Sequence, residues 1–553
     1  MTDRALRLLR ENPRLAELAA FPFSFDLDRA EHAEDVRLAS GGPLEPIAGD
    51  DTGGTYFVCG DGSVLYADSE GSAGVIGDSV DEALEVLVGL PGWHDHLRLT
   101  PADGEERILA AVAETEDGIR ESYGIDAERS ELRAGLGLPE RSPVELVGLL
   151  HTALSRTEPD FLLLGAEEGC AHDLLDPHPR PQLWETGLAR GRADLALLRA
   201  GAAWEEVAGD RTRRALALRA AQFDRREGDL PLLRHLLRHE AEASMTDELR
   251  LATVLVGLRG LPEDLPLLLE VRETDFDTWC GLGGMPEPGA EPAELLRWAR
   301  DLDDSFFGAD PADEPLFTWT GLAREQGLTE VARVALIRAL DDFDLRVYTA
   351  GRDGGTPDRR LADPLGSLVR EFEQLGDTFQ ALRAQRLRLP LLPATAHDRV
   401  SALLGLARLE RAEDRFAEAA RTLATLRDTL ANPGDDTTAW WRETNLGVYV
   451  VQEHHALARA AAVDATSAKE VREVTAAAAE LLAGLSGAAR AFAGRSRAEE
   501  TADVTSAAAP PERSVPAGPS PDPSNPPHSP TPSIPSSTSG PSSPSGPWNP
   551  TAG

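Results

Sequence analysis

The sequence predicts a multidomain protein in which a small α+β N-terminal domain precedes an all-α helical-repeat solenoid and a disordered tail rich in Pro and Ser. Three observations support this prediction: a helix, antiparallel strands and a second helix follow one another in the first 100 residues, a five-residue phrase later recurs every 35 residues, and 15 prolines fall among the last 44 residues. A chain of 553 residues is also longer than one hydrophobic core usually organises.

Residues 1–100 read as helix, antiparallel strands and helix, which is an α+β pattern. Two apolar runs flank a Gly-Asp-Gly turn at residues 60–62, so we expect a β-hairpin there. Ser79 stands three residues before Glu82, a pattern typical of a capped helix start. The expected elements are a helix over 3–10, strands over 55–59, 63–67 and 75–76, and a helix from Val80 to about Leu90.

Three segments of this domain carry a resemblance to a known family. They are Pro-Ile-Ala-Gly-Asp-Asp-Thr-Gly-Gly-Thr-Tyr-Phe over 46–57, Val-Leu-Tyr-Ala-Asp-Ser-Glu-Gly over 64–71, and Asp-Ser-Val-Asp-Glu-Ala-Leu over 78–84. Residues 40–98 thereby resemble the SUKH superfamily, of the fungal cell-wall-assembly regulator type, although the Leu-Pro-x-x-Tyr and Asn-Gly elements that open that family are missing. The resemblance implies a non-enzymatic protein-binding module, often an immunity protein against secreted bacterial toxins.

The contact residues of that family follow no fixed motif. The aromatic and acidic residues of the predicted hairpin, and the Trp after the second helix, are therefore our candidates for partner binding. They are Tyr56, Tyr66, Asp68, Glu70 and Trp93.

After a charged helical connector over 101–142, the phrases that start at Asp194, Asp229 and Asp264 share the form Asp-Leu-x-Leu-Leu and lie 35 residues apart. A related phrase starts at Asp160, and Leu216 and Ala217 recur as Leu251 and Ala252. Such a period predicts stacked helical hairpins, each opened by Asp as an N-cap, so residues 143–311 resemble HEAT repeats. The alternative is a set of Leu-rich helices whose register coincides by chance.

Residues 312–500 show a second helical pattern. A turn rich in Gly or Asp precedes a helix with a small residue near its start, at Ala332, Ala381 and Ala419. The pattern resembles the second half of a tetratricopeptide unit, where a small residue lets two helices approach closely. An Ala-rich stretch over 471–493 reads as a terminal helix, and the Pro/Ser-rich segment 501–553 has too few apolar residues to fold.

The composition restricts the partners. With 94 acidic and 55 basic residues the chain carries a formal charge of -39, which disfavours binding to nucleic acid or to anionic membranes. The charge fits a basic protein partner, but an acid-rich, high-GC proteome is the simpler explanation. Three widely spaced cysteines, and the absence of a signal-like or membrane-spanning apolar run, predict a cytoplasmic protein.

Chemistry-bearing motifs are sparse. The segment with Cys170, His172 and His178 offers residue types that zinc accepts, but its spacing is not that of a zinc motif, and Pro177 and Pro179 indicate a loop. We find no nucleophile elbow and no phosphate-binding loop. The sequence thus predicts no catalytic residue, no cofactor and no metal. The weak candidates for a metal site are Cys170, His172 and His178.

Phe276 and Trp279 interrupt a segment that the repeat register predicts to be polar. They are either core residues of a modified terminal unit or aromatic anchors on a binding face, where Trp is enriched.

These observations favour a non-enzymatic protein-binding protein, with an immunity protein that masks a basic toxin as the first hypothesis. A helical-repeat scaffold or regulatory adaptor is the second, and a metal-dependent hydrolase with its site around residues 170–178 is the third. The oligomeric state stays open.

Overall fold

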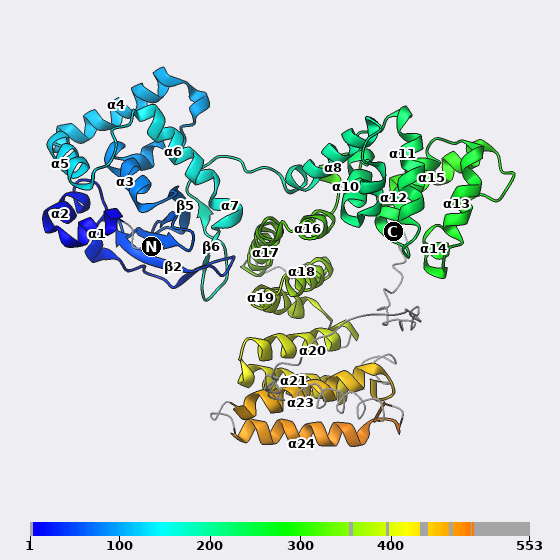
Figure 1. The fold of residues 1–553 in the computed structure, drawn as a ribbon. Helices are drawn as coiled ribbons and strands as arrows, with labels where there is room; N and C mark the ends of the chain where they lie inside the picture. Colours follow the sequence, from blue (N-terminus) through cyan, green and yellow to red (C-terminus); the bar gives the residue numbers. More distant parts are fainter. Residues whose placement is uncertain are drawn as a thin grey trace, which may run out of the picture. The chain divides into compact units, whose positions relative to one another are not determined.

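The computed structural model describes residues 4–352, 358–393, 397–431, 441–463, 468–487 and 489–490 (Figure 1). The described chain is mostly helical, with a small sheet region in its N-terminal part. The predicted tail at 501–553 lies outside these residues, as does the end of the predicted terminal helix. Among the described helices, none has a stretch of sufficient length and apolarity to cross a bilayer.

The N-terminal part contains two sheets. In the larger sheet, β2, β3, β4 and β5 are antiparallel neighbours in that order, and β7 pairs in parallel with β5. In the smaller sheet β1 pairs with β6. The bounds are β1 Val36–Leu38, β2 Leu44–Gly49, β3 Thr55–Cys59, β4 Val64–Ala67, β5 Ser72–Gly77, β6 Leu163–Gly165 and β7 Asp173–Leu174. The predicted hairpin is confirmed, and Gly62 at its turn has a φ of 99°, which favours glycine.

Seven α-helices accompany these sheets among the described residues. The side chain of Ser79 accepts the amide of Glu82 and begins α3, as predicted. The bounds are α1 Arg4–Glu11, α2 Pro13–Ala20, α3 Val80–Gly89, α4 Glu105–Ser122, α5 Asp126–Leu136, α6 Pro143–Ser155 and α7 Thr157–Asp160.

The N-terminal core does not end at residue 100. Ile108 of α4, Leu132 of α5 and Leu150 of α6 are buried in the same cluster as Tyr66 and Leu84. The predicted 101–142 connector is therefore an integral part of this core rather than a link, because its helices supply apolar side chains that the sheet needs for cover.

The predicted first repeat unit is wrong. The phrase that starts at Asp160 forms the end of α7 and then strand β6, whose Leu163 pairs with Leu38. Phe161 and Leu163 pack with the sheet residues Phe57 and Leu65. An apolar run of this length fits a buried strand as well as a helix, and the partner strand far away in the sequence decides which forms.

Further along the chain, residues that lie 35 positions apart are buried alike. Leu216 and Ala217 in one unit, and Leu251 and Ala252 in the next, are all fully buried. Asp229 and Asp264 stand directly before helices, but neither carboxylate accepts an amide of the first turn, so the predicted N-caps are wrong, and Asp194 lies inside α8. The bounds are α8 Leu183–Arg199, α9 Trp204–Gly209, α10 Arg211–Phe223, α11 Leu230–Glu240, α12 Asp247–Gly257, α13 Leu265–Arg272, α14 Phe276–Gly281 and α15 Pro292–Phe306.

Two of the repeated Asp residues have a role that the sequence pattern does not reveal. Arg199 forms an ion pair of 2.7 Å with Asp229. The equivalent ion pair in the next unit joins Asp264 to Arg234, which lies 35 residues after Arg199. Both carboxylates are almost completely buried. Since an unpaired buried charge is strongly destabilising, each pair holds one unit in register with the next.

The C-terminal helices follow one another in sequence order, with consecutive helices packed together (Figure 1). Their bounds are α16 Leu316–Glu325, α17 Thr329–Arg352, α18 Ala362–Gln374, α19 Thr378–Arg388, α20 His397–Ala412, α21 Phe416–Ala431, α23 Asn445–Val463 and α24 Ala468–Gly484.

Three turns of this region share one geometry. Gly327, Gly376 and Asp414 have positive φ values of 78°, 70° and 57°, and each stands two residues before a helix. The small residues predicted to allow close helix contact, Ala332, Ala381 and Ala419, each occupy the fourth position of that helix and are buried. The recurring turn and small residue agree with the predicted pattern.

Candidate functional site

Three of the five candidate residues of the N-terminal domain are core residues. Tyr56, Tyr66 and Trp93 are at most 3% exposed. The ring of Tyr66 contacts that of Tyr56 at 4.9 Å and that of Trp93 at 5.2 Å, measured between centroids. The prediction that these three side chains contact a partner is therefore corrected, because all three are packed in the core.

A buried carboxylate organises this aromatic cluster. The hydroxyl of Tyr66 donates to Asp50 Oδ2 at 2.6 Å, while the amides of Thr52 and Gly54 donate to Oδ1 at 2.8 Å. Burial by itself raises the pKa of Asp50, but the hydrogen bonds from Tyr66, Thr52 and Gly54 outweigh it and lower the pKa. A Cβ at Gly54 would lie 2.1 Å from the Tyr66 hydroxyl oxygen, so only glycine fits. The Asp-Asp-Thr-Gly-Gly segment therefore serves the fold.

The other two candidates lie at the turn between β4 and β5. Asp68 is half-buried, and its Oδ1 accepts the amides of Glu70 and Ser72. Glu70 is exposed. Asp68 thus closes the turn, and Glu70 is the candidate of this group that is fully available to a partner.

The weak metal candidates do not form a common site. Cys170 Sγ accepts a hydrogen bond from Arg383, whereas the ring of His178 packs against that of His151 with 4.8 Å between centroids. The pKa of the Cys170 thiol is raised, mainly by burial, whereas reactive thiols have lowered pKa values. The pKa of His172 is lowered, again mainly by burial. Within the described residues these three side chains are not part of any metal-binding group.

Phe276 and Trp279 lie on the surface. Phe276 begins α14, which Asp275 caps by accepting the amide of Thr278, and Trp279 is one helical turn further. The two rings stack with 6.3 Å between centroids and 21° between planes, at 75% and 54% exposure. The sequence left open whether these two residues belong to the core or are exposed anchors. The structure contradicts the core interpretation and agrees with an exposed aromatic pair.

The surroundings of this pair are acidic. Glu270, Glu273 and Asp277 are exposed in the same short segment. Arg272 is the basic residue there, and its guanidinium lies within 4.0 Å of Glu273 and Glu287. We call Phe276, Trp279 and these three exposed carboxylates the acidic–aromatic patch. Exposed aromatic side chains in a charged surface segment are typical of a protein-binding site.

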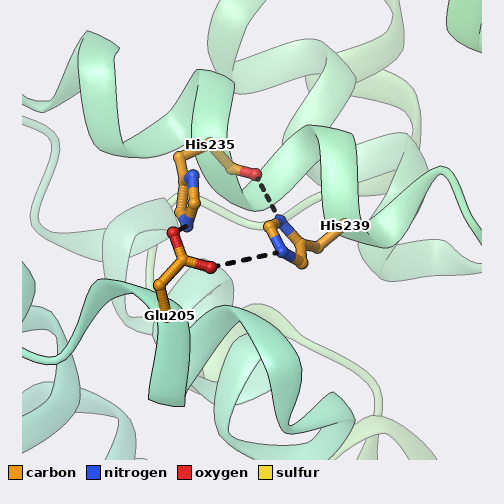
Figure 2. Close-up of side chains that lie close together, drawn as sticks. All are labelled: Glu205, His235 and His239. Carbon is orange, nitrogen blue, oxygen red and sulfur yellow. Dashed lines mark hydrogen bonds and ion pairs between the residues drawn. The ribbon is translucent and has the colours of Figure 1, made fainter.

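A second cluster was not predicted. His235 and His239 of α11 face Glu205 of α9, with Nε2–Oε distances of 3.8 and 4.0 Å (Figure 2). The spacing of the two histidines by four residues was a readable signal, since such residues share a helix face. Glu205 precedes them by 30 residues, so no sequence pattern connects it with them.

Comparison of the chain with family models, curated proteins and solved structures finds no match. The class of protein therefore rests on the fold and these surfaces.

Proposed function

We propose that this chain is a non-enzymatic protein-binding protein of the cytoplasm, in which a helical-repeat solenoid acts as an adaptor and the acidic–aromatic patch is a contact surface. The observation that carries the proposal is the stacked, solvent-exposed pair of Phe276 and Trp279. Exposing two large rings is unfavourable unless a partner covers them, and Trp is enriched among residues that dominate binding energy.

The charge of the chain supports a basic partner. The patch carries three exposed carboxylates, and the whole chain has 39 more acidic than basic residues. Charge of this sign accelerates association with a basic protein and disfavours acidic competitors more than it adds affinity. The repeated units, joined by the buried pairs of Arg199 with Asp229 and Arg234 with Asp264, support a rigid platform for such a contact.

The test compares three full-length proteins in quantitative capture from native lysate: the wild type, the variant Phe276→Ser/Trp279→Ser, and the control Tyr348→Ser. Tyr348 is 65% exposed on α17, so its replacement removes a comparable exposed ring elsewhere. We expect a basic protein that the wild type and the control retain and that the double variant loses, with affinity reduced by about 2 kcal/mol or more, roughly 30-fold. Equal capture by all three proteins would contradict the proposal.

The first hypothesis, toxin masking by the N-terminal domain, now rests on Glu70 and Asp68 because the aromatic candidates are buried. Removing residues 1–100 is not a clean test, since α4, α5 and α6 share their core with the removed part. Glu70→Arg is the suitable variant, because it reverses an exposed charge at a turn. Loss of the captured partner in Glu70→Arg, with retention in Phe276→Ser/Trp279→Ser, would favour the N-terminal immunity hypothesis over the adaptor.

A further inference from the structure

We propose that Glu205, His235 and His239 form a binding site for a divalent first-row transition-metal ion such as Zn²⁺. Each residue offers one ligand atom, and these atoms lie within 4.8 Å of one another (Figure 2). Two imidazoles and one carboxylate are a donor set that zinc accepts. The site is separate from the acidic–aromatic patch, so the proposal stands independently of the proposed function.

The backbone places the donors in suitable positions. His235 and His239 occupy consecutive turns of α11, and their ring centroids are 4.7 Å apart. Zn–N and Zn–O bonds of about 2.0–2.2 Å put the ligands of a tetrahedral site roughly 3.4 Å apart. His235 Nε2 lies 3.8 Å from Glu205 Oε1 and His239 Nε2 lies 4.0 Å from Oε2. With one ligand atom per residue the separations reach up to 4.8 Å, so the ligand atoms need to approach one another by roughly 0.4–1.4 Å. The side chain of Glu205 is 83% exposed and is free to make that movement.

The tautomer of His239 is set for metal binding. Its Nδ1 lies 3.2 Å from the carbonyl oxygen of His235, and a carbonyl oxygen only accepts, so Nδ1 carries the proton. In the neutral ring the lone pair of Nε2 then points toward the Glu205 carboxylate. A cation between these two electron-rich groups makes the arrangement favourable. A ligating histidine whose other nitrogen donates to a backbone carbonyl is the usual outer-shell arrangement of a metal site.

His235 supplies the independent observation. Its Nε2 is buried and has no hydrogen-bond partner among the described residues. The oxygen of Glu205 is 3.8 Å away, beyond hydrogen-bonding distance. Buried polar atoms are normally paired. The unpaired Nε2 of His235, which faces a carboxylate and a second imidazole, is explained if it binds a metal ion. Imidazole donors favour Zn²⁺, Cu²⁺ and Ni²⁺ over Mg²⁺ and Ca²⁺.

Three protein ligands leave the fourth position of a tetrahedral ion on the side of the exposed Glu205, where water or a donor from another molecule completes the coordination. The ion would join α9 to α11 and so stiffen this part of the repeat region. The competing explanation is an ion pair between protonated histidine and Glu205, which needs no metal.

Titration calorimetry of chelator-treated full-length protein with Zn²⁺ separates these explanations. We expect one site that Glu205→Gln and His239→Gln each weaken by at least about tenfold, since even outer-shell partners of metal sites contribute that much. His151→Gln is the matched control, because His151 and His178 also form a ring contact but belong to no three-donor group among the described residues. It should bind as the wild type does, and Zn²⁺ should raise the Tm of the wild type and the control only.

Trp204 provides a local readout. Its ring lies 5.2 Å from that of His235, so Ni²⁺ or Co²⁺ at the site should quench its fluorescence. Trp204→Phe should lose this quenching while retaining Zn²⁺ affinity. In the wild type, excess Mg²⁺ or Ca²⁺ should not reverse the quenching by Ni²⁺ or Co²⁺. Zn²⁺ affinity that is the same in the wild type, Glu205→Gln and His239→Gln would overturn the proposal, as would the absence of micromolar binding in the wild type.

Discussion

Aromatic side chains gather at two places in this chain, one near β4 and one on α14. Around β4, Tyr56, Tyr66 and Trp93 are packed under helices and are at most 3% exposed. On α14, Phe276 and Trp279 stack on each other in solvent. From the sequence, the first group was the candidate for partner binding, whereas the second was either core residues or binding anchors. The difference shows that an aromatic residue indicates a binding surface only after the elements that cover it are known.

The largest effect should come from truncating the buried Trp. Trp93→Ala removes a ring that is 3% exposed and packs against Tyr66, so we expect a loss of about 3–5 kcal/mol in the free energy of unfolding. Trp279→Ala should change it by no more than about 0.5 kcal/mol. Urea unfolding followed by far-ultraviolet circular dichroism measures both. Similar losses in the two variants would break the comparison between core and surface.

A smaller effect should follow from removing one hydroxyl. Tyr66→Phe leaves the packing unchanged but deletes the hydrogen bond to Asp50, and bonds to charged groups contribute about 1.5–3 kcal/mol. The control is Tyr348→Phe, since Tyr348 is 65% exposed. Retention of partner capture by Tyr66→Phe would sharpen the distinction between a residue that supports the fold and one that contacts a partner.

The smallest change in stability should come from lowering the pH. The pKa of Asp50 is lowered in the folded protein, so the carboxylate adds stability above its unfolded pKa, about 3.8, and that contribution disappears as the pH falls through the folded value. Asp50→Asn lacks this titration. Between pH 5 and pH 3 the wild type should therefore lose more stability than the variant, as measured by urea unfolding at each pH. Parallel pH profiles would show that the pKa of Asp50 is not lowered in the folded protein.

Local patterns predicted local structure well. The hairpin around Gly62 and the start of α3 at Ser79 followed from residues that lie next to each other in the chain. The periodic Leu and Ala positions predicted buried helix faces, as at Leu216 and Leu251. These features depend on backbone preferences and on one apolar face, which neighbouring residues determine.

The predictions that failed depended on distant segments. The strand at Leu163–Gly165 was mistaken for a repeat helix, because its pairing partner lies at Val36–Leu38. The connector was set apart from the core, although Ile108 and Leu132 pack with the first strands and helices.

The sequence by itself determined the hairpin and the helix that follows it in the first 100 residues, the 35-residue period and the acidic charge. Only the tertiary structure decided that Tyr66 and Trp93 are buried, that Trp279 is exposed, and that Glu205 lies beside His235. The physical reason is that burial and side-chain clusters arise where elements from different parts of the chain meet. Such contacts leave no periodic trace in the residues that make them.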